Sequence, residues 1–238
     1  MTKPFGVEAL LFDIFGTVVD WRGSIIRDLS AWGERKGLKV DWTAFTMDWR
    51  GLYQPSMEEV RSGRRPFVIL DVLHRESLEK LLVKYGIEGL SEVEKDLLNR
   101  VWHRLDPWPD VVPGLSRLKW HVSLVTCSNG NVAILVDMAR RARLPWDAIL
   151  GGEPTRAYKP MPDAYLKTAS MLGLRPNQCM MVAAHNSDLA AARALGLKTA
   201  MVPRPTEYGP GQSKDLVAED AWDVVTDSFT GLAAALGC

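Results

Sequence analysis

Short apolar runs alternate along this chain with longer segments of helical periodicity, and this alternation limits the possible folds more than any other feature. The apolar runs are too short for helices and end at polar or glycine-containing turns, which is typical of buried strands. They cover residues 8–12, 121–126, 178–183, 198–202 and 223–226. Helical patterns lie between them at residues 131–143, 163–172 and 187–195. Alternating strands and helices predict an α/β fold with a mostly parallel sheet and helices on both faces.

A long helical segment interrupts this alternation directly after the first apolar run. Between the first strand and two prolines near residue 108, the apolar residues recur with helical periodicity throughout. Ser91 and Glu94 have the spacing of a capping box at the start of its last helix. We therefore predict a core made of residues 1–19 and 106–238, and an inserted all-helical cap domain made of residues 20–105.

Composition points to a small partner. The chain has 29 acidic and 29 basic side chains, whereas surfaces that bind nucleic acids or anionic membranes normally carry a basic excess. The three cysteines are an odd, widely spread set, which predicts no disulfide framework and a reducing compartment. No apolar run could span a membrane, and residues 1–6 lack the layout of a signal peptide. We expect a cytoplasmic protein with a small-molecule ligand, no nucleic-acid partner and no membrane partner.

Polar residues follow three of the apolar runs, at the edge where parallel sheets bind ligands. An aspartate at a strand end can act as a covalent nucleophile if nearby cations and hydrogen-bond donors keep it ionised. Lys159, on a loop before a helix, could supply the cation. We expect it to meet the polar residues that follow the strands, which are Asp13 and Thr17, Ser128 and Asn129, and His185 and Asp188.

Each of these residues also has a purely structural interpretation. An aspartate before Gly-Thr is a turn residue in most proteins, and Thr17 could cap that turn. The segment 128–130 could be a loop and helix N-cap, and Lys159 could be a solvated loop lysine. Taken singly, none of them establishes a site.

Taken in order, these residues form four motifs that resemble those of the haloacid dehalogenase superfamily. The motifs are Asp13-x-Phe15-Gly16-Thr17, Ser128-Asn129-Gly130, Lys159-Pro160 and Asp188. The resemblance covers essentially the whole chain, and the helical segment resembles the cap domain of that superfamily. It implies a Rossmann-like core, an inserted helical cap and hydrolase chemistry at Asp13.

Position 15 separates two kinds of chemistry within this superfamily. Its phosphatases usually carry a second aspartate there as general acid, together with further acids for Mg²⁺ in the last motif. Here the residue is Phe15, and only Asp188 is acidic in the last motif. The chain instead resembles the 2-haloacid dehalogenase branch. That resemblance implies hydrolysis of short-chain (S)-2-haloacids to 2-hydroxy acids and halide through an ester of Asp13, with no metal ion or other cofactor.

Two further residues match this branch. Its members carry an arginine on a cap helix and a tyrosine six residues after the motif lysine, and Arg50 and Tyr165 stand at the matching positions. The resemblance implies that Arg50 receives the halide and that Ser128 binds the substrate carboxylate. Lys159 and Asp188 would balance the charge of Asp13. The substrate pocket would be shaped by Phe15, Asn129 and Tyr165. The alternatives are that Arg50 is a solvated arginine and Tyr165 a core residue.

The chain departs from the branch in its last motif. Many members carry Ser and Asn where this chain has Ala183 and His185. His185 could therefore place the hydrolytic water, either as a base or as a hydrogen-bonding group. Two other functions stay open, a Mg²⁺-dependent phosphatase that acts on a small phosphate ester and a non-catalytic binder of small acids. For the assembly we expect a homodimer.

Overall fold

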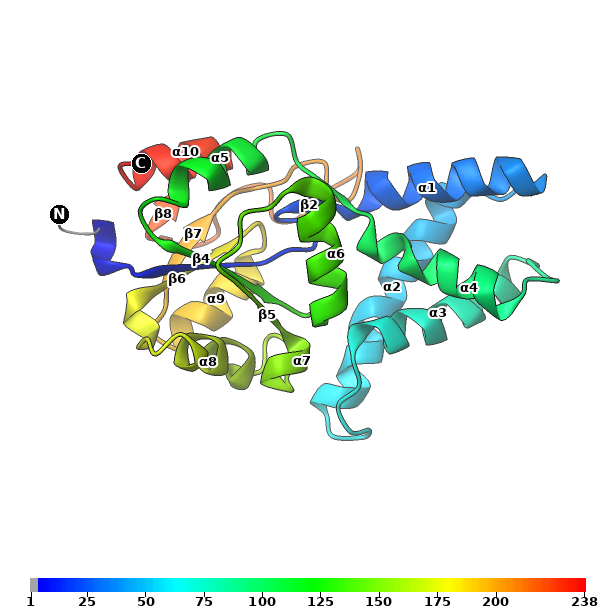
Figure 1. The fold of residues 1–238 in the computed structure, drawn as a ribbon, viewed down its shortest axis with the longest axis horizontal. Helices are drawn as coiled ribbons and strands as arrows, with labels where there is room; N and C mark the ends of the chain where they lie inside the picture. Colours follow the sequence, from blue (N-terminus) through cyan, green and yellow to red (C-terminus); the bar gives the residue numbers. More distant parts are fainter. Residues whose placement is uncertain (1–3) are drawn as a thin grey trace.

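The computed structural model of this protein describes residues 4–238 and has a six-stranded sheet at its centre (Figure 1). The sheet strands are β1 (Ala9–Phe12), β4 (Ser123–Ser128), β5 (Ala148–Gly151), β6 (Cys179–Ala183), β7 (Lys198–Met201) and β8 (Val224–Val225). They lie in the order β5-β4-β1-β6-β7-β8, and every neighbouring pair is parallel. Because β1 pairs with both β4 and β6, the three strands that precede the polar motifs are neighbours. The predicted parallel α/β core is confirmed.

Helices cover both faces of the sheet, as the alternation predicts. One face packs against α5 (Val111–Leu118), α6 (Val132–Ala142) and α10 (Phe229–Ala235), and the other against α8 (Pro162–Met171) and α9 (Asn186–Ala194). The short helices α7 (Gly152–Thr155), η1 (Pro4–Gly6) and η3 (Pro176–Gln178) lie in connections. Leu10 and Phe12 of β1 belong to the first core cluster, whereas Ala9 and Leu11 belong to the second. Successive strand side chains point to opposite faces, so β1 lies between two apolar layers.

The helical insert follows β1 closely and lies beside the sheet in Figure 1. It consists of α1 (Trp21–Lys36), α2 (Trp42–Arg61), α3 (Leu70–Lys84), α4 (Glu92–Asn99) and the 3₁₀ helix η2 (Arg100–His103). The capping box of Ser91 and Glu94 is present at the start of α4.

A short antiparallel ribbon of two strands, β2 (Val19–Asp20) and β3 (Asp106–Pro107), joins the places where the chain leaves and re-enters the core. We propose that this ribbon divides the chain into the core of residues 1–19 and 106–238 and the cap of residues 20–105. Residues 1–3 lie outside the described part.

Aromatic side chains connect the insert to the core. Five of the nine tryptophans lie in the insert, and Trp102 packs against Trp21 and Trp49 with ring centroids 6.5 and 5.7 Å apart. Phe15, from the loop after β1, meets the edge of Trp102 at 6.0 Å and that of Tyr53 at 6.3 Å. The apolar layer of the core therefore continues into the insert, which holds α2 near the carboxyl end of β1.

A buried histidine forms a polar contact between the insert and the core. His103 Nε2 lies 2.9 Å from Asp71 Oδ1 on α3, and its Nδ1 lies 2.7 Å from Asp137 Oδ2 on α6. Ionised carboxylates only accept hydrogen bonds, so both ring nitrogens must donate and the ring is an imidazolium. Burial would lower the pKa of His103, but the two carboxylates outweigh it and raise the pKa above its ordinary value. We call this arrangement the His103 bridge.

The sequence analysis missed one strand of the six-stranded sheet and both two-residue strands of the ribbon. β5 is an edge strand of four residues that ends at Gly151 and is only partly buried, so it shows neither a long apolar run nor a clear alternation.

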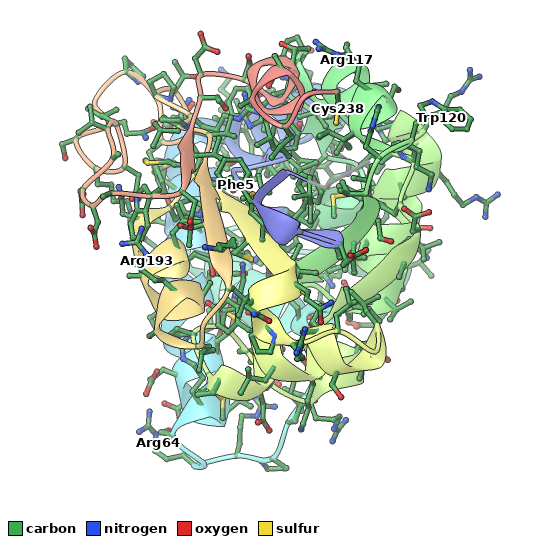
Figure 2. The ribbon with its side chains drawn as sticks, turned by 90° about the vertical axis from the view of Figure 1, so that its left-hand side faces the viewer. Phe5, Arg64, Arg117, Trp120, Arg193 and Cys238 are labelled. Atoms are coloured by element: carbon green, nitrogen blue, oxygen red, sulfur yellow. The ribbon has the colours of Figure 1, made fainter. Side chains whose placement is uncertain are left out.

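Three further features concern the cysteines, the helix lengths and the face opposite the insert. Cys127, Cys179 and Cys238 are free thiols. No helix within residues 4–238 is long and apolar enough to cross a membrane. Figure 2 faces the side opposite the insert, where Trp120, 86% exposed, projects into solvent.

Candidate active site

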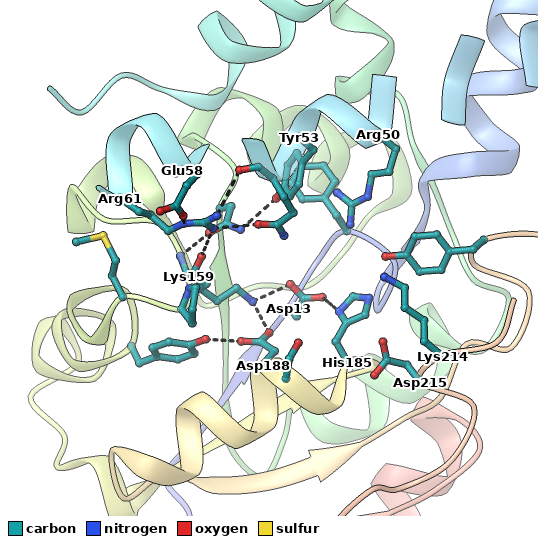
Figure 3. Close-up of a pocket in the computed structure, with 18 residues that line it drawn as sticks. Asp13, Arg50, Tyr53, Glu58, Arg61, Lys159, His185, Asp188, Lys214 and Asp215 are labelled. Atoms are coloured by element: carbon teal, nitrogen blue, oxygen red, sulfur yellow. Dashed lines mark hydrogen bonds and ion pairs between the residues drawn. The ribbon is translucent and has the colours of Figure 1, made fainter. Parts of the chain in front are cut away.

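A cavity of about 620 Å³ lies where the insert meets the carboxyl ends of the strands (Figure 3). Eight of the ten residues that the sequence singled out line this cavity. They are Asp13, Phe15, Arg50, Asn129, Lys159, Tyr165, His185 and Asp188. Thr17 and Ser128 are buried nearby but are not part of its lining. The parallel sheet therefore brings together residues that are far apart in the sequence.

Asp13 is held by three side chains. Its Oδ1 accepts a hydrogen bond from Lys159 Nζ at 2.7 Å, and its Oδ2 accepts one from Thr17 Oγ1 at 2.7 Å. His185 Nδ1 lies 3.3 Å from the same Oδ2. Burial alone would raise the pKa of Asp13, but Lys159 and His185 outweigh it and hold this pKa well below its ordinary value. Asp13 is therefore an ionised carboxylate with a fixed orientation.

Lys159 occupies the space between two carboxylates. Its ammonium group contacts both Asp13 and Asp188, as Figure 3 shows, and Tyr165 Oη donates to Asp188 Oδ1 at 2.6 Å. Asn129 Oδ1 accepts from the Lys159 backbone N–H at 2.7 Å, which fixes the lysine loop against the second motif. Within residues 4–238, no group of three or more His, Cys, Asp or Glu side chains is arranged to hold a metal ion.

Thr17 and Ser128 support the site from behind. Thr17 Oγ1 accepts from the Ala184 backbone N–H at 2.8 Å while it donates to Asp13, so it links the loops after β1 and β6. Ser128 Oγ accepts from the Gly130 N–H at 3.1 Å and so stabilises its own loop. The role of Ser128 in binding a substrate carboxylate stays a prediction.

Arg50 reaches the cavity from α2. Its guanidinium lies over the rings of Tyr53 and Trp21, 4.2 and 5.1 Å from their centroids. Nη2 lies 4.0 Å from Glu207 Oε1, whereas the buried Nη1 has no hydrogen-bond partner in the described part of the chain. A buried donor without a partner is costly, so an anionic ligand at this position would complete the hydrogen bonding of Arg50.

Glu207 is a site residue that the sequence analysis missed. It lies in the irregular segment after β7, is 1% exposed, and accepts from His185 Nε2 at 2.8 Å and from Trp21 Nε1 at 2.9 Å. A Cβ atom at Gly16, whose φ is +95°, would lie 2.2 Å from Glu207 Oε1. The rule that polar residues follow strands would have led to this segment if it had also been applied to the fourth apolar run.

The cavity lining contains further residues that the sequence analysis did not single out as site residues. Arg61 belongs to α2 and donates to the Lys159 carbonyl at 2.9 Å and to Glu58 Oε2 at 2.9 Å. The other residues of the lining are Gln54, Pro160, Met161, Ser187, Tyr208, Lys214 and Asp215, with Tyr53 beside Arg50. Arg61 thus joins the insert to the loop that carries the lysine.

Comparisons with known proteins agree with this geometry. Over its full length, the chain is 48% identical to a defluorinating L-2-haloacid dehalogenase of known crystal structure, with a TM-score of 0.96 and 99% of that chain covered. It is 26% identical over 201 residues to the (S)-2-haloacid dehalogenase of Xanthobacter autotrophicus, covering 83% of this chain and 76% of the relative. A phosphoglycolate phosphatase of Salmonella typhi is 33% identical over 92 residues, which are 39% of this chain and 34% of that protein.

The family model gives the widest assignment. Residues 7–196 match the model of haloacid dehalogenase-like hydrolases, and this stretch includes all four motifs and the whole helical insert. The fold agrees with that match, since a parallel sheet with an inserted helical cap surrounds the four motifs. The chain therefore belongs to the haloacid dehalogenase-like hydrolases and is an enzyme of that family.

Proposed function

We propose that this protein is a 2-haloacid dehalogenase that converts short-chain (S)-2-haloacids to 2-hydroxy acids, through an ester of Asp13 and without a metal ion. One observation carries the proposal. A buried, ionised aspartate lies in a cavity with a paired lysine, an arginine that has an unpartnered N–H group, and no second acid at position 15. The similarity to two proteins with this activity supports it.

In the first step, a carboxylate oxygen of Asp13 attacks C2 of the substrate. The new O–C2 bond forms with inversion as the carbon–halogen bond breaks, and the halogen leaves with the bonding electron pair. Lys159 and Thr17 fix the carboxylate for this attack, with donor distances of 2.7 Å each. Preorganised charge of this kind supplies much of the rate enhancement in enzymes.

We assign the leaving halide to Arg50. Its Nη1 is buried without a partner among the described residues, and the guanidinium lies over the rings of Trp21 and Tyr53. A halide leaves without needing a proton, so Phe15 at the position of a general acid is compatible with this chemistry. Phe15 is buried against Tyr53 and Trp102 and contributes an apolar wall.

In the second step, water attacks Cγ of the Asp13 ester. The ester bond breaks between Cγ and the oxygen attached to C2, so the 2-hydroxy acid leaves and the carboxylate is regenerated with one oxygen atom from water. For the substrate carboxylate we propose Asn129, which lines the cavity, as first contact, with Ser128 behind it.

Metal independence is supported by the position of Lys159. Its ammonium group lies between Asp13 and Asp188, where it provides the positive charge that two neighbouring carboxylates require. Asp188 also accepts from Tyr165 Oη. One of the chain's own side chains thus supplies positive charge to the pair of Asp13 and Asp188.

The partial similarity to phosphoglycolate phosphatases favours a second candidate, a Mg²⁺-dependent phosphatase. That reaction needs a proton for its alkoxide leaving group, and Phe15 cannot supply one. We therefore rank it below dehalogenation.

A single-turnover reaction in H₂¹⁸O tests the proposal. With excess enzyme, (S)-2-chloropropionate and a metal chelator, we expect chloride release and one ¹⁸O atom in the peptide that contains Asp13. Enzyme incubated without substrate is the control and stays unlabelled. Chloride release with an unlabelled peptide would exclude the ester. Hydrolysis of a phosphate ester that requires Mg²⁺, without chloride release, would establish the phosphatase. Binding without any turnover would establish a small-acid binder.

A further inference from the structure

His185 is enclosed by acids on both sides of its ring. Nδ1 lies 3.3 Å from Asp13 Oδ2, and Nε2 lies 2.8 Å from Glu207 Oε2. Both acids are ionised. The pKa of Asp13 is held well below its ordinary value. Burial would raise the pKa of Glu207, but His185, Arg50 and Trp21 outweigh it and lower this pKa. Glu207 only accepts hydrogen bonds, so Nε2 donates to it, and the negative charge of Asp13 at ion-pair distance from Nδ1 favours a proton on that nitrogen as well. In the resting enzyme His185 is therefore an imidazolium, and an imidazolium cannot act as a base.

Esterification of Asp13 changes one of these two partners. An ester carries no charge and is a weaker acceptor than a carboxylate, so the positive ring loses its ion pair at Nδ1 while the pair with Glu207 at Nε2 remains. We propose that ester formation converts His185 from an imidazolium into the general base of the hydrolytic step, with Glu207 as the positioning residue that keeps Nδ1 directed at the ester. This inference rests on the proposed function.

The proton balance of the cycle is complete. When Asp13 forms the ester and the halide leaves, His185 Nδ1 releases its proton to solvent. The proton and the halide are therefore both released in the first half-reaction. Water then gives one proton to Nδ1 while its oxygen bonds to Asp13 Cγ. The Cγ–O bond to the product breaks, and the remaining proton of the water ends on the 2-hydroxy acid. Asp13 is again a carboxylate and His185 an imidazolium.

The surroundings of His185 favour this change. Burial lowers its pKa, and the charges of Glu207 and Asp13 raise it, so that it lies well above the ordinary value of 6.5 in the resting state. The other charged groups near the ring are Lys159 on the far side of Asp13, Arg50 near Glu207, and Lys214 and Asp215 in the cavity lining. Lys159 and Arg50 are cations that disfavour a second positive charge. Once Asp13 is neutral, burial and these cations lower the pKa of His185, and within residues 4–238 Glu207 is the one acid in contact with the ring that still raises it.

Glu207 is built to keep its position through the cycle. Its Oε1 accepts from Trp21 Nε1, while Oε2 accepts from His185. Gly16 leaves the space that the carboxylate occupies, because any larger residue there would collide with it. Since the pair with Glu207 forms at Nε2, the neutral ring keeps its proton on Nε2 and presents an unprotonated Nδ1 to the ester.

The first test follows the protonation of His185 by NMR. Asp13→Asn removes the charge of Asp13 as the ester does, and the chain has only four histidines to assign. We expect His185 to remain protonated well above pH 6.5 in the wild type. Its pKa should fall by about one to three pH units in Asp13→Asn, while that of His103 stays unchanged. An unchanged His185 pKa in Asp13→Asn would overturn the inference. This readout needs no substrate and is independent of the dehalogenase proposal.

The second test separates the two half-reactions. In Glu207→Gln, ester hydrolysis should slow by about 10²-fold more than first-turnover halide release does, as for loss of a general base. The ester should then accumulate on the peptide with Asp13 and be visible by mass spectrometry. His185→Asn should show the same accumulation and serves if Glu207→Gln folds poorly. Glu219→Gln, in an exposed carboxylate of the same segment, is the matched control.

The pH dependence gives a further readout. In the wild type, the acid limb of ester hydrolysis should lie at higher pH than the acid limb of halide release, because hydrolysis needs neutral His185 and halide release needs only ionised Asp13. Coincident limbs, or a variant Glu207→Gln that hydrolyses its ester at the wild-type rate, would contradict the inference while leaving the ester mechanism intact. Absence of any halide release from wild type would instead contradict the proposed function.

Discussion

His185 and His103 both lie between two carboxylates, but they differ in what happens to these carboxylates during the proposed reaction. Each ring lies between two carboxylates, Asp13 and Glu207 for His185 and Asp71 and Asp137 for His103. Both carry a raised pKa for the same physical reason, that two nearby negative charges outweigh the cost of burial. The difference lies in one partner. In the proposed reaction Asp13 becomes an ester, whereas Asp71 and Asp137 are not part of the cavity and keep their charges.

The comparison shows that a buried histidine between two carboxylates keeps its proton unless the reaction removes the charge of one of these carboxylates. The His103 bridge holds α3 against α6 and stays protonated. His185 is coupled to a group that changes its charge in every cycle. The four predictions below change Asp13, its lysine partner, His103 and a third buried histidine in turn.

Asp13→Asn should have the largest effect on activity. It removes the nucleophile, so we expect halide release to fall by about 10⁴-fold or more. Circular dichroism should show an intact fold, because the amide has the shape of the carboxylate and its single oxygen can still accept the hydrogen bond from Lys159. Activity at the wild-type level would refute Asp13 as nucleophile.

Lys159→Met should have the next largest effect. It leaves two buried carboxylates without their cation, and breaking a buried pair typically costs about 3–5 kcal/mol of stability. The pKa of Asp13 should rise, so the acid limb of halide release should move to higher pH. In the wild type, Asp13 contributes stability above its ordinary pKa of 3.8 that is lost as the pH falls towards its lowered pKa. Urea unfolding from about pH 5 down to the lowest pH at which the protein is still folded follows this loss, which should be much smaller in the variant.

His103→Gln should lower stability without a comparable loss of activity. It removes a charged donor from two carboxylates, which we expect to cost about 2 kcal/mol. Because the pKa of His103 is raised in the folded protein, its contribution is complete below pH 6.5 and is lost as the pH rises through the folded pKa. The difference in unfolding free energy should therefore be larger at pH 6 than at pH 9. The exposed His121→Gln is the matched control, and equal differences at both pH values would argue against a charged His103 bridge.

His74→Phe should have the smallest effect near neutral pH. His74 is stacked on Trp102 with ring centroids 4.1 Å apart, and neither ring nitrogen has a hydrogen-bond partner among the described residues. Burial lowers its pKa to about 3. We expect a change within about 1 kcal/mol at pH 7, since the replacement removes two unpaired polar atoms. Below pH 6.5 the wild type loses stability because the unfolded His74 takes up a proton, so the variant should become relatively more stable in thermal unfolding at pH 5.

The core was more predictable from sequence than the cap side of the site. Asp13, Lys159 and Asp188 follow apolar runs or precede a helix, and a parallel sheet gathers such positions at one edge, so their meeting could be expected. Arg50 could be assigned only by resemblance, since no rule of spacing says which face of α2 covers the sheet. Packing of Phe15 and Trp102 decides that, and it involves residues about 90 positions apart.

Glu207 shows what sequence reasoning lacked. It lies in a segment without regular structure, and its significance depends on Trp21 and His185, which meet it only in the folded chain. Sequence analysis could nominate His185 as a base or a hydrogen-bonding group. It could not find the second acid that makes the ring an imidazolium in the resting enzyme.

The β2–β3 ribbon has a consequence for how such enzymes diversify. Because the two ends of the insert are hydrogen-bonded neighbours, with the Trp108 N–H also bound to the Val18 carbonyl, an insert of another length can leave and re-enter the core at the same two points. Loops between adjacent ends tolerate large changes in length. The helical insert can therefore be replaced as a unit, provided that the new insert again supplies a guanidinium above Asp13 and an indole N–H for Glu207.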